Sequence, residues 1–191
     1  MKKEILPHKH CNLCSNKTII PNKGLGCRLN LEKPELNTSC WKYEPLNDLD
    51  EIIQSTNLEY QVIKNRTLTV YLHLAFYLLV GFAFLISGIL IGKYALNGGV
   101  ISTVPLIIMG IGIMILPYSV SPYISFRQKL GVSKNDKDEL DKILSIYKIE
   151  YLIDLKFGKK FHNRQEVSVD LLVKSHATTL AKKHSTLNIY P

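Results

Sequence analysis

The sequence predicts a membrane α-helical hairpin of two transmembrane helices, with a small cysteine-rich N-terminal module and a small α+β cytoplasmic C-terminal module. Residues 67–92 contain His73 as their only strongly polar side chain, and residues 100–121 contain no charge. Each run exceeds the about 18 to 20 residues that a helix needs to cross hydrocarbon. A third observation, the confinement of all cysteines to the first 40 residues, predicts the N-terminal module.

Length limits what lies outside the bilayer. The chain has 191 residues, of which 46% are apolar. Two spans leave residues 1–66 and 122–191 outside the membrane, and either flank is too short for a large catalytic core. The sequence therefore excludes a fully soluble cytosolic enzyme, but it names neither a reaction nor a signal.

Charge predicts the orientation of the hairpin. The 24 Lys and Arg residues outnumber the 16 Asp and Glu residues, for a net charge of +8. Lys64 and Arg66 precede the first span, and Arg127 and Lys129 follow the second. The connection 93–99 carries only Lys93. The positive-inside rule places both termini in the cytoplasm and residues 93–99 outside, in a bacterial inner (cytoplasmic) membrane. No run typical of a cleaved signal peptide precedes residue 67, so the first span is expected to direct insertion.

The cysteines predict a metal site in residues 1–46. Cys11, Cys14, Cys27 and Cys40 form the pattern C-x2-C-x12-C-x12-C. In a reducing cytoplasm, thiols at such spacing favour a metal over disulfides, and four sulfur ligands suit a closed, structural Zn²⁺ centre. The segment has many Gly and Pro residues and few large apolar ones, so it would hardly fold alone. A bound metal can supply the missing folding energy. The alternatives are His8 or His10 replacing one cysteine, free structural thiols, a disulfide, or an iron–sulfur site.

These residues carry a resemblance. The cysteine spacing, the Gly24-Leu25-Gly26-Cys27 turn and the aromatic Trp41 and Tyr43 after the last cysteine resemble the N-terminal module of uncharacterised bacterial two-span membrane proteins. Here Arg28-Leu29-Asn30 follows the third cysteine where Leu-Thr is expected, and Trp41 replaces a common Pro. The resemblance implies a metal-binding, membrane-tethered module and no activity.

Residues 47–66 read as a juxtamembrane helix. Asn47 is suited to the N-cap, and Asp48, Asp50 and Glu51 are acids near the helix start. One helical face comprises Leu49, Ile52, Ile53, Thr56, Tyr60 and Ile63. The helix is interpreted as a packed connection or, alternatively, as a lever or dimer contact that relays the state of the metal module to the membrane.

The spans carry small residues at helix-packing spacing. Gly88 and Gly92 form a small-xxx-small pattern, and the simplest partner is the second span through Gly110 and Gly112. An intermolecular contact is the alternative. His73 is expected at the cytoplasmic interface rather than in a functional intramembrane site.

Residues 122–191 predict a helix followed by a β-hairpin. Ser133 to Asn135 can begin a helix whose apolar face is Leu140, Ile143, Leu144 and Tyr147. Strict alternation then predicts two half-buried strands within 149–174. Their inner face comprises Tyr151, Ile153, Leu155, Val167, Val169 and Leu171. Residues 175–191 fit a short helix or a third strand equally well.

Catalytic motifs are missing from the sequence. His162, His176 and His184, with Asp154, Glu166 and Asp170, match no known catalytic spacing, and the sequence leaves open whether these histidines form any site. The basic residues Lys159, Lys160 and Arg164 fit anionic headgroups better than nucleic acid, because no nucleic-acid-binding motif accompanies them.

The sequence therefore favours a membrane-anchored binding or signalling accessory protein that presents its cytoplasmic modules to a protein partner or to anionic lipid. Its surroundings are the lipid bilayer, and homo-oligomerisation is a further option. The alternatives are a small membrane enzyme or toxin-like effector, or a homo-oligomeric pore.

Overall fold

The computed structural model describes residues 11–20, 24–28, 40, 42–95, 103–161, 164–175, 178–179 and 183–189. The chain divides into two compact units. The helix-pair unit comprises residues 61–132, and the sheet unit combines residues 1–60 with 133–191. The predicted module 1–46 and residues 133–191 of the predicted module 122–191 thus belong to one unit, whereas residues 122–132 belong to the helix-pair unit.

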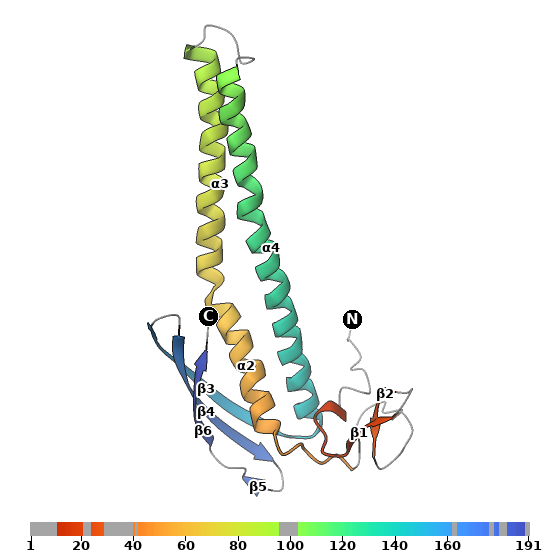
Figure 1. Ribbon diagram of the computed structural model, residues 1–191. Helices are drawn as coiled ribbons and strands as arrows, with labels where there is room; N and C mark the ends of the chain where they lie inside the picture. The colour runs from red at the N-terminus through yellow and green to blue at the C-terminus, as the bar shows by residue number, and fades with distance from the viewer. Residues whose placement is uncertain are drawn as a thin grey trace. The chain divides into compact units, whose positions relative to one another are not determined.

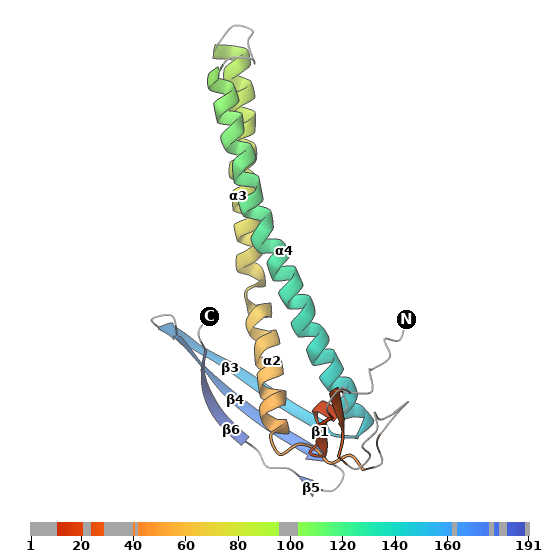
Figure 2. The same ribbon diagram turned by 45° about the vertical axis from the view of Figure 1, so that its right-hand side comes forward.

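Two helices form the helix-pair unit. Helix α3 (Thr67–Leu90) continues into a π-helical turn, η1 (Ile91–Ala95), and the first part of α4 (Thr103–Ile146) runs beside α3 (Figures 1 and 2). The structure thus has two helices that are long and apolar enough to cross a membrane. The buried share of their most apolar windows is only 11% and 17%, so most of this apolar surface faces outward.

Glycines set the contact between α3 and α4. A Cβ atom on Gly112 would lie 2.9 Å from the carbonyl oxygen of Gly81, and one on Gly88 would lie 3.1 Å from that of Pro105. Such distances leave room only for hydrogen, so the backbones approach closely. Gly88 and Gly112 thus both lie at the contact between the two helices, as predicted, but Gly112 faces Gly81 rather than Gly88. The predicted contact through Gly110 is wrong, because a Cβ there would meet nothing within 4 Å.

Helix α4 is longer than the sequence predicted. Instead of ending near residue 121 and restarting at Ser133 to Asn135, it runs unbroken from Thr103 to Ile146. The segment before Ser133 contains no turn, so a residue suited to an N-cap simply occupies a helix interior. An i,i+4 ion pair between Lys137 Nζ and Asp141 Oδ2, 2.7 Å apart, supports the helix beyond that point.

The end of α4 is a Schellman motif. Lys148 adopts a left-handed conformation with φ of 54°. The amide of Ile149 donates to Leu144 O at 3.0 Å, and that of Lys148 donates to Ser145 O at 3.2 Å. These bonds satisfy carbonyls that the helix end would leave open, and buried Leu144 and Ile149 provide the apolar contact that accompanies the motif.

An antiparallel sheet follows α4. Strands β3 (Glu150–Phe161) and β4 (Arg164–Ser175) pair so that Tyr151 faces Val173 and Leu155 faces Val169. On the other side of β4 lie β5 (Thr178–Thr179) and β6 (Lys183–Ile189) (Figure 1). The predicted hairpin and its inner face are confirmed, since Val167, Val169 and Leu171 are buried. The undecided tail supplies strands rather than a helix.

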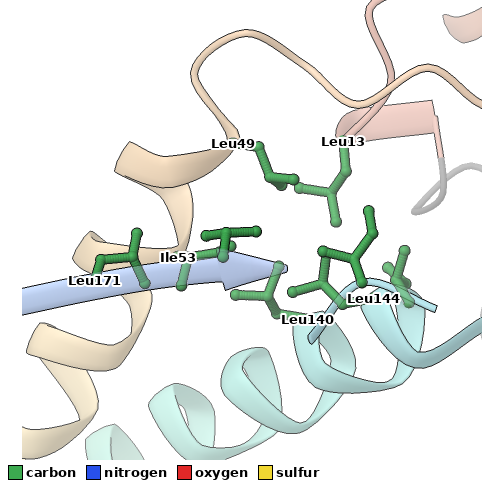
Figure 3. Packing of buried hydrophobic residues seen from close by; sticks show 9 residues of the cluster. Leu13, Leu49, Ile53, Leu140, Leu144 and Leu171 are labelled. Atoms are coloured by element: carbon green, nitrogen blue, oxygen red, sulfur yellow. The ribbon is translucent and has the colours of Figure 1, made fainter. Parts of the chain in front are cut away.

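The core of the sheet unit joins segments far apart in the sequence. Helix α2 (Leu49–Asn65) and the end of α4 pack on the sheet (Figure 3). The buried cluster consists of Leu13, Leu49, Ile53, Leu140, Ile143, Leu144, Ile149, Leu171 and Val173. Leu13 comes from the cysteine-rich segment, so that segment shares the core of the sheet unit.

A polar network lies at one side of this core. Tyr151 Oη donates to Asp141 Oδ1, and Asn57 Nδ2 donates to Tyr151 Oη at 3.2 Å. Lys137 completes the network through its ion pair with Asp141. Burial, and then the hydrogen bond to Asp141, raises the pKa of Tyr151. The network thus ties α2, α4 and β3 together through groups that would be costly to bury unpaired.

Candidate metal centre

The first two cysteines flank a tight turn. The amide of Cys14 donates to the carbonyl oxygen of Cys11 at 3.2 Å, and that of Lys17 donates to Cys14 O at 3.3 Å. Both cysteines are buried, as is Leu13 between them. The spacing of two residues thus forms a short turn between the two cysteines, as the sequence predicted.

A small hairpin returns the third cysteine to this turn. Strand β1 (Lys17–Ile20) pairs antiparallel with β2 (Gly24–Cys27), with Lys17 opposite Cys27. The amide of Arg28 donates to Asn16 O at 2.8 Å and extends the pairing. Because Cys27 ends β2 opposite the residue where β1 begins, it lies at the same end of the hairpin as Cys14.

The fourth cysteine, Cys40, belongs to a separate segment, which forms hydrogen bonds with the turn between Cys11 and Cys14. The amide of Ser15 donates to Glu44 O at 2.9 Å, and that of Leu46 donates to Leu13 O at 3.1 Å. The Glu44 carboxylate also accepts hydrogen bonds from the side chains of Ser15 and Asn16. Cys40 is joined to this segment by a turn in which the Tyr43 amide donates to its carbonyl oxygen at 3.3 Å.

The four thiols influence one another electrostatically. Burial raises the pKa of the Cys11 thiol, and the charges of Cys27, Cys14 and Cys40 raise it further. All four cysteines are free, with no disulfide between them. Three chain segments carry these thiols, and thiolates at Cys14, Cys27 and Cys40 would repel one at Cys11 unless a cation neutralised them.

An electrostatic influence between thiols does not by itself show that they coordinate a metal ion. Within the parts of the chain that the structure describes, which include all four cysteines, no three His, Cys, Asp or Glu side chains are already placed to hold a metal ion. Zinc ligation thus stays a prediction. The residues fit the ion by chemistry, since four soft thiols match a tetrahedral zinc shell.

Aromatic residues attach these segments to the end of α4. The rings of Tyr43 and Tyr147 stack with centroids 3.6 Å apart and 9° between their planes. The amide of Cys40 donates to Tyr147 Oη at 3.1 Å, and Tyr43 Oη donates to Leu13 O at 3.1 Å. Burial, followed by the charges of Cys14 and Tyr147, raises the pKa of Tyr43. Tyr147 was predicted only as a helix-face residue, and no sequence pattern indicated its stacking partner.

Of the remaining candidate histidines, the structure describes only His184. His8, His10, His162 and His176 lie outside the described residues. His184 Nδ1 lies 2.7 Å from Asp170 Oδ1 on an exposed part of the sheet. Lys156 is 3.8 Å from the same carboxylate. Exposed polar contacts of this kind contribute about 0 to 1 kcal/mol and need no functional explanation.

Comparisons with protein families, curated proteins and solved structures found no match for this chain. The resemblance to two-span proteins with a four-cysteine module therefore stays a prediction.

Proposed function

We propose that this protein is anchored in the bacterial inner membrane by α3 and the first part of α4, with both termini in the cytoplasm. The support is the outward-facing apolar surface of these helices, including Leu79 at 71% exposure. In water, each exposed apolar side chain costs roughly 25 cal/mol per Å² of surface. Lipid removes that cost, because hydrocarbon solvates leucine as well as a protein core does.

The four cysteines are proposed to hold one structural Zn²⁺. Among the described residues of the segments that carry them, the large apolar side chains at the core cluster are Leu13, which belongs to it, and Tyr43, which packs against it. Burying one leucine contributes about 1.5 to 3 kcal/mol, and an aromatic stack about 0.5 to 1.5 kcal/mol. Zinc binding by cysteine-rich peptides is worth about 10 to 16 kcal/mol, which far exceeds both. Four thiolates fill a tetrahedral shell, so the proposed role of the metal is folding rather than catalysis.

The whole molecule is proposed to act as a membrane-anchored binding or signalling accessory. One observation carries this proposal. The cysteine segments pack into the core of the sheet unit, which also contains the end of α4. Helix α4 itself begins in the helix-pair unit. Such a unit is built to present a folded surface beside the membrane. A protein partner or anionic lipid is the proposed target of that surface.

Zinc content tests the proposal. The full-length protein, extracted from membranes in mild detergent, is expected to carry one equivalent of zinc. Cys27→Ser should lose the metal, whereas the matched variant Asn12→Ala, at an exposed position in the first cysteine turn, should retain it. Less than about half an equivalent in the wild type, or full retention after all four cysteines are replaced by serine, would contradict the assignment.

A further inference from the structure

The turn between the first two cysteines is built into the core of the sheet unit. Leu13 is 7% exposed and belongs to the buried cluster (Figure 3). Its partners in that cluster include Leu49 from the start of α2 and Leu140 and Leu144 from the end of α4. Because Leu13 lies between Cys11 and Cys14, any change in the shape of that turn moves a core side chain.

The segment of the fourth cysteine contacts the same end of α4. Tyr43 stacks on Tyr147, and the Cys40 amide donates to the Tyr147 hydroxyl. The Tyr43 hydroxyl donates in turn to Leu13 O, so the two contacts support each other. The cysteine segments therefore hold α4 through two side chains, each within three residues of a cysteine.

We propose that metal occupancy of the four-cysteine centre controls the docking of residues 11–46 on the end of α4, so that the centre acts as a metal-dependent clamp. This inference rests on the proposed zinc centre and adds to it what the metal regulates. With metal bound, the clamp is closed as in the structure. Without metal, Leu13 and Tyr43 leave α4.

The physical reason is preorganisation. Leu13 and Tyr43 come from chain segments connected through residues 29–39, and presenting both at once to α4 costs conformational entropy. A metal ion tied to cysteines on both segments fixes their relative position in advance, which makes the second contact nearly intramolecular. In the described residues, the other contacts that hold these segments are the short β1–β2 pairing, a few backbone hydrogen bonds and the exposed side-chain hydrogen bonds from Ser15 and Asn16 to Glu44.

Hydrogen exchange of the full-length protein in detergent tests the clamp. The amides of Tyr147, Lys148 and Ile149 donate the hydrogen bonds that close the end of α4, and those of residues 143–146 lie in its last turn, so exchange over residues 143–149 reports on docking. After zinc is removed with an excess of chelator, their exchange should accelerate by roughly ten- to a hundredfold, the scale expected when one leucine contact is lost. Exchange in α3 should not change.

Two variants separate docking from metal binding. Leu13→Ala keeps all four cysteines and should retain zinc, yet residues 143–149 should exchange rapidly even with zinc bound. Ile19→Ala is the matched control, because Ile19 lies on β1 in the same module and is 82% exposed. It should behave as the wild type. If Leu13→Ala does not fold, Tyr147→Leu makes the same test from the α4 side, with faster exchange expected in residues 11–20.

The outcomes are distinguishable. If elemental analysis shows that the chelator removed zinc while exchange at 143–149 stayed the same, the clamp is wrong and the zinc centre stands. If the wild-type protein holds no zinc before treatment, the zinc centre itself fails, and the clamp fails with it.

Discussion

The two units of this protein place the same kinds of side chain in opposite directions. In the sheet unit, Ile53 and Leu144 are fully buried, whereas in the helix-pair unit Leu79 and Met114 are among the most exposed residues. The buried residues of α3 are the glycines Gly81 and Gly88. The sheet unit therefore buries apolar side chains, whereas α3 of the helix-pair unit buries glycines at a close backbone contact. This is the difference expected between a unit suited to water and one suited to lipid.

The largest effect should come from a charge in the core of the sheet unit. Ile53→Asp buries an unpaired carboxylate in the centre of the cluster, which costs several kcal/mol against a total stability of about 5 to 15 kcal/mol. We expect the sheet unit to become protease-sensitive while α3 remains intact in detergent. Glu51→Asp, an exposed position on the same helix, is the control. Equal protease resistance of the two variants would contradict the core assignment.

Two leucines of nearly equal exposure should respond differently to the same substitution. Leu79 in α3 is 71% exposed, and Leu152 in β3 is 68% exposed. Leu79→Asp should cost about 2.5 to 3.5 kcal/mol for insertion near the middle of a span, whereas Leu152→Asp should be within about 0.5 kcal/mol of neutral. Membrane insertion of both variants is the measurement. Similar insertion of the two would mean that water, not lipid, surrounds α3.

Two glycines of α4 should differ for a packing reason. A Cβ on Gly112 approaches the backbone oxygen of Gly81 at 2.9 Å, whereas a Cβ on Gly110 meets nothing. Gly112→Ala should destabilise the helix pair by about 1 to 3 kcal/mol, and Gly110→Ala should not. Unfolding titrations in mixed detergent compare them. A greater loss at Gly110 would indicate a contact with another chain instead.

The polar network of the sheet unit predicts a smaller effect. Tyr151→Phe removes the hydroxyl that donates to Asp141 and accepts from Asn57. Leaving a buried amide with one partner fewer costs about 1 to 3 kcal/mol. Thermal unfolding of the sheet unit, monitored by its protease sensitivity, measures the loss of stability. An unchanged midpoint would show that water replaces the hydroxyl.

The smallest predicted change is stabilising. Lys148 has a left-handed backbone conformation, which costs a non-glycine residue about 1 to 2 kcal/mol. Lys148→Gly should therefore raise stability by up to about 1 kcal/mol. Lys142→Gly, in the helix before it, should lower stability by about 1 kcal/mol. The same sign for both variants would argue against the Schellman geometry.

Sequence patterns predicted elements better than partners. Alternation of Tyr151, Ile153 and Leu155 was enough to predict β3 and its inner face, because a strand has a side-chain period of two. The cysteine spacing likewise predicted the turn at Cys11. Neither pattern says what the element packs against, so the insertion of Leu13 into a core shared with α4 was not foreseen.

Two other features were missed for identifiable reasons. Ser133 to Asn135 looked like a helix start because capping residues and acids followed one another, but a cap marks a boundary only where the chain turns before it. Gln54 and Asn57 are buried in α2 although the apolar period gave no reason to place polar residues inward. Their partners, Ser185 and Tyr151, lie more than 90 residues away in sequence, beyond the reach of local patterns.

Protease treatment of inside-out membrane vesicles tests most directly the claim that the two units are built for different solvents. The digested vesicles are washed at high pH, and the peptides that stay with the lipid are identified by mass spectrometry. We expect the retained peptides to come from α3 and from α4 up to about residue 121, with the strands of the sheet unit removed. Release of the α3 peptides into the wash, together with the sheet unit, would contradict it.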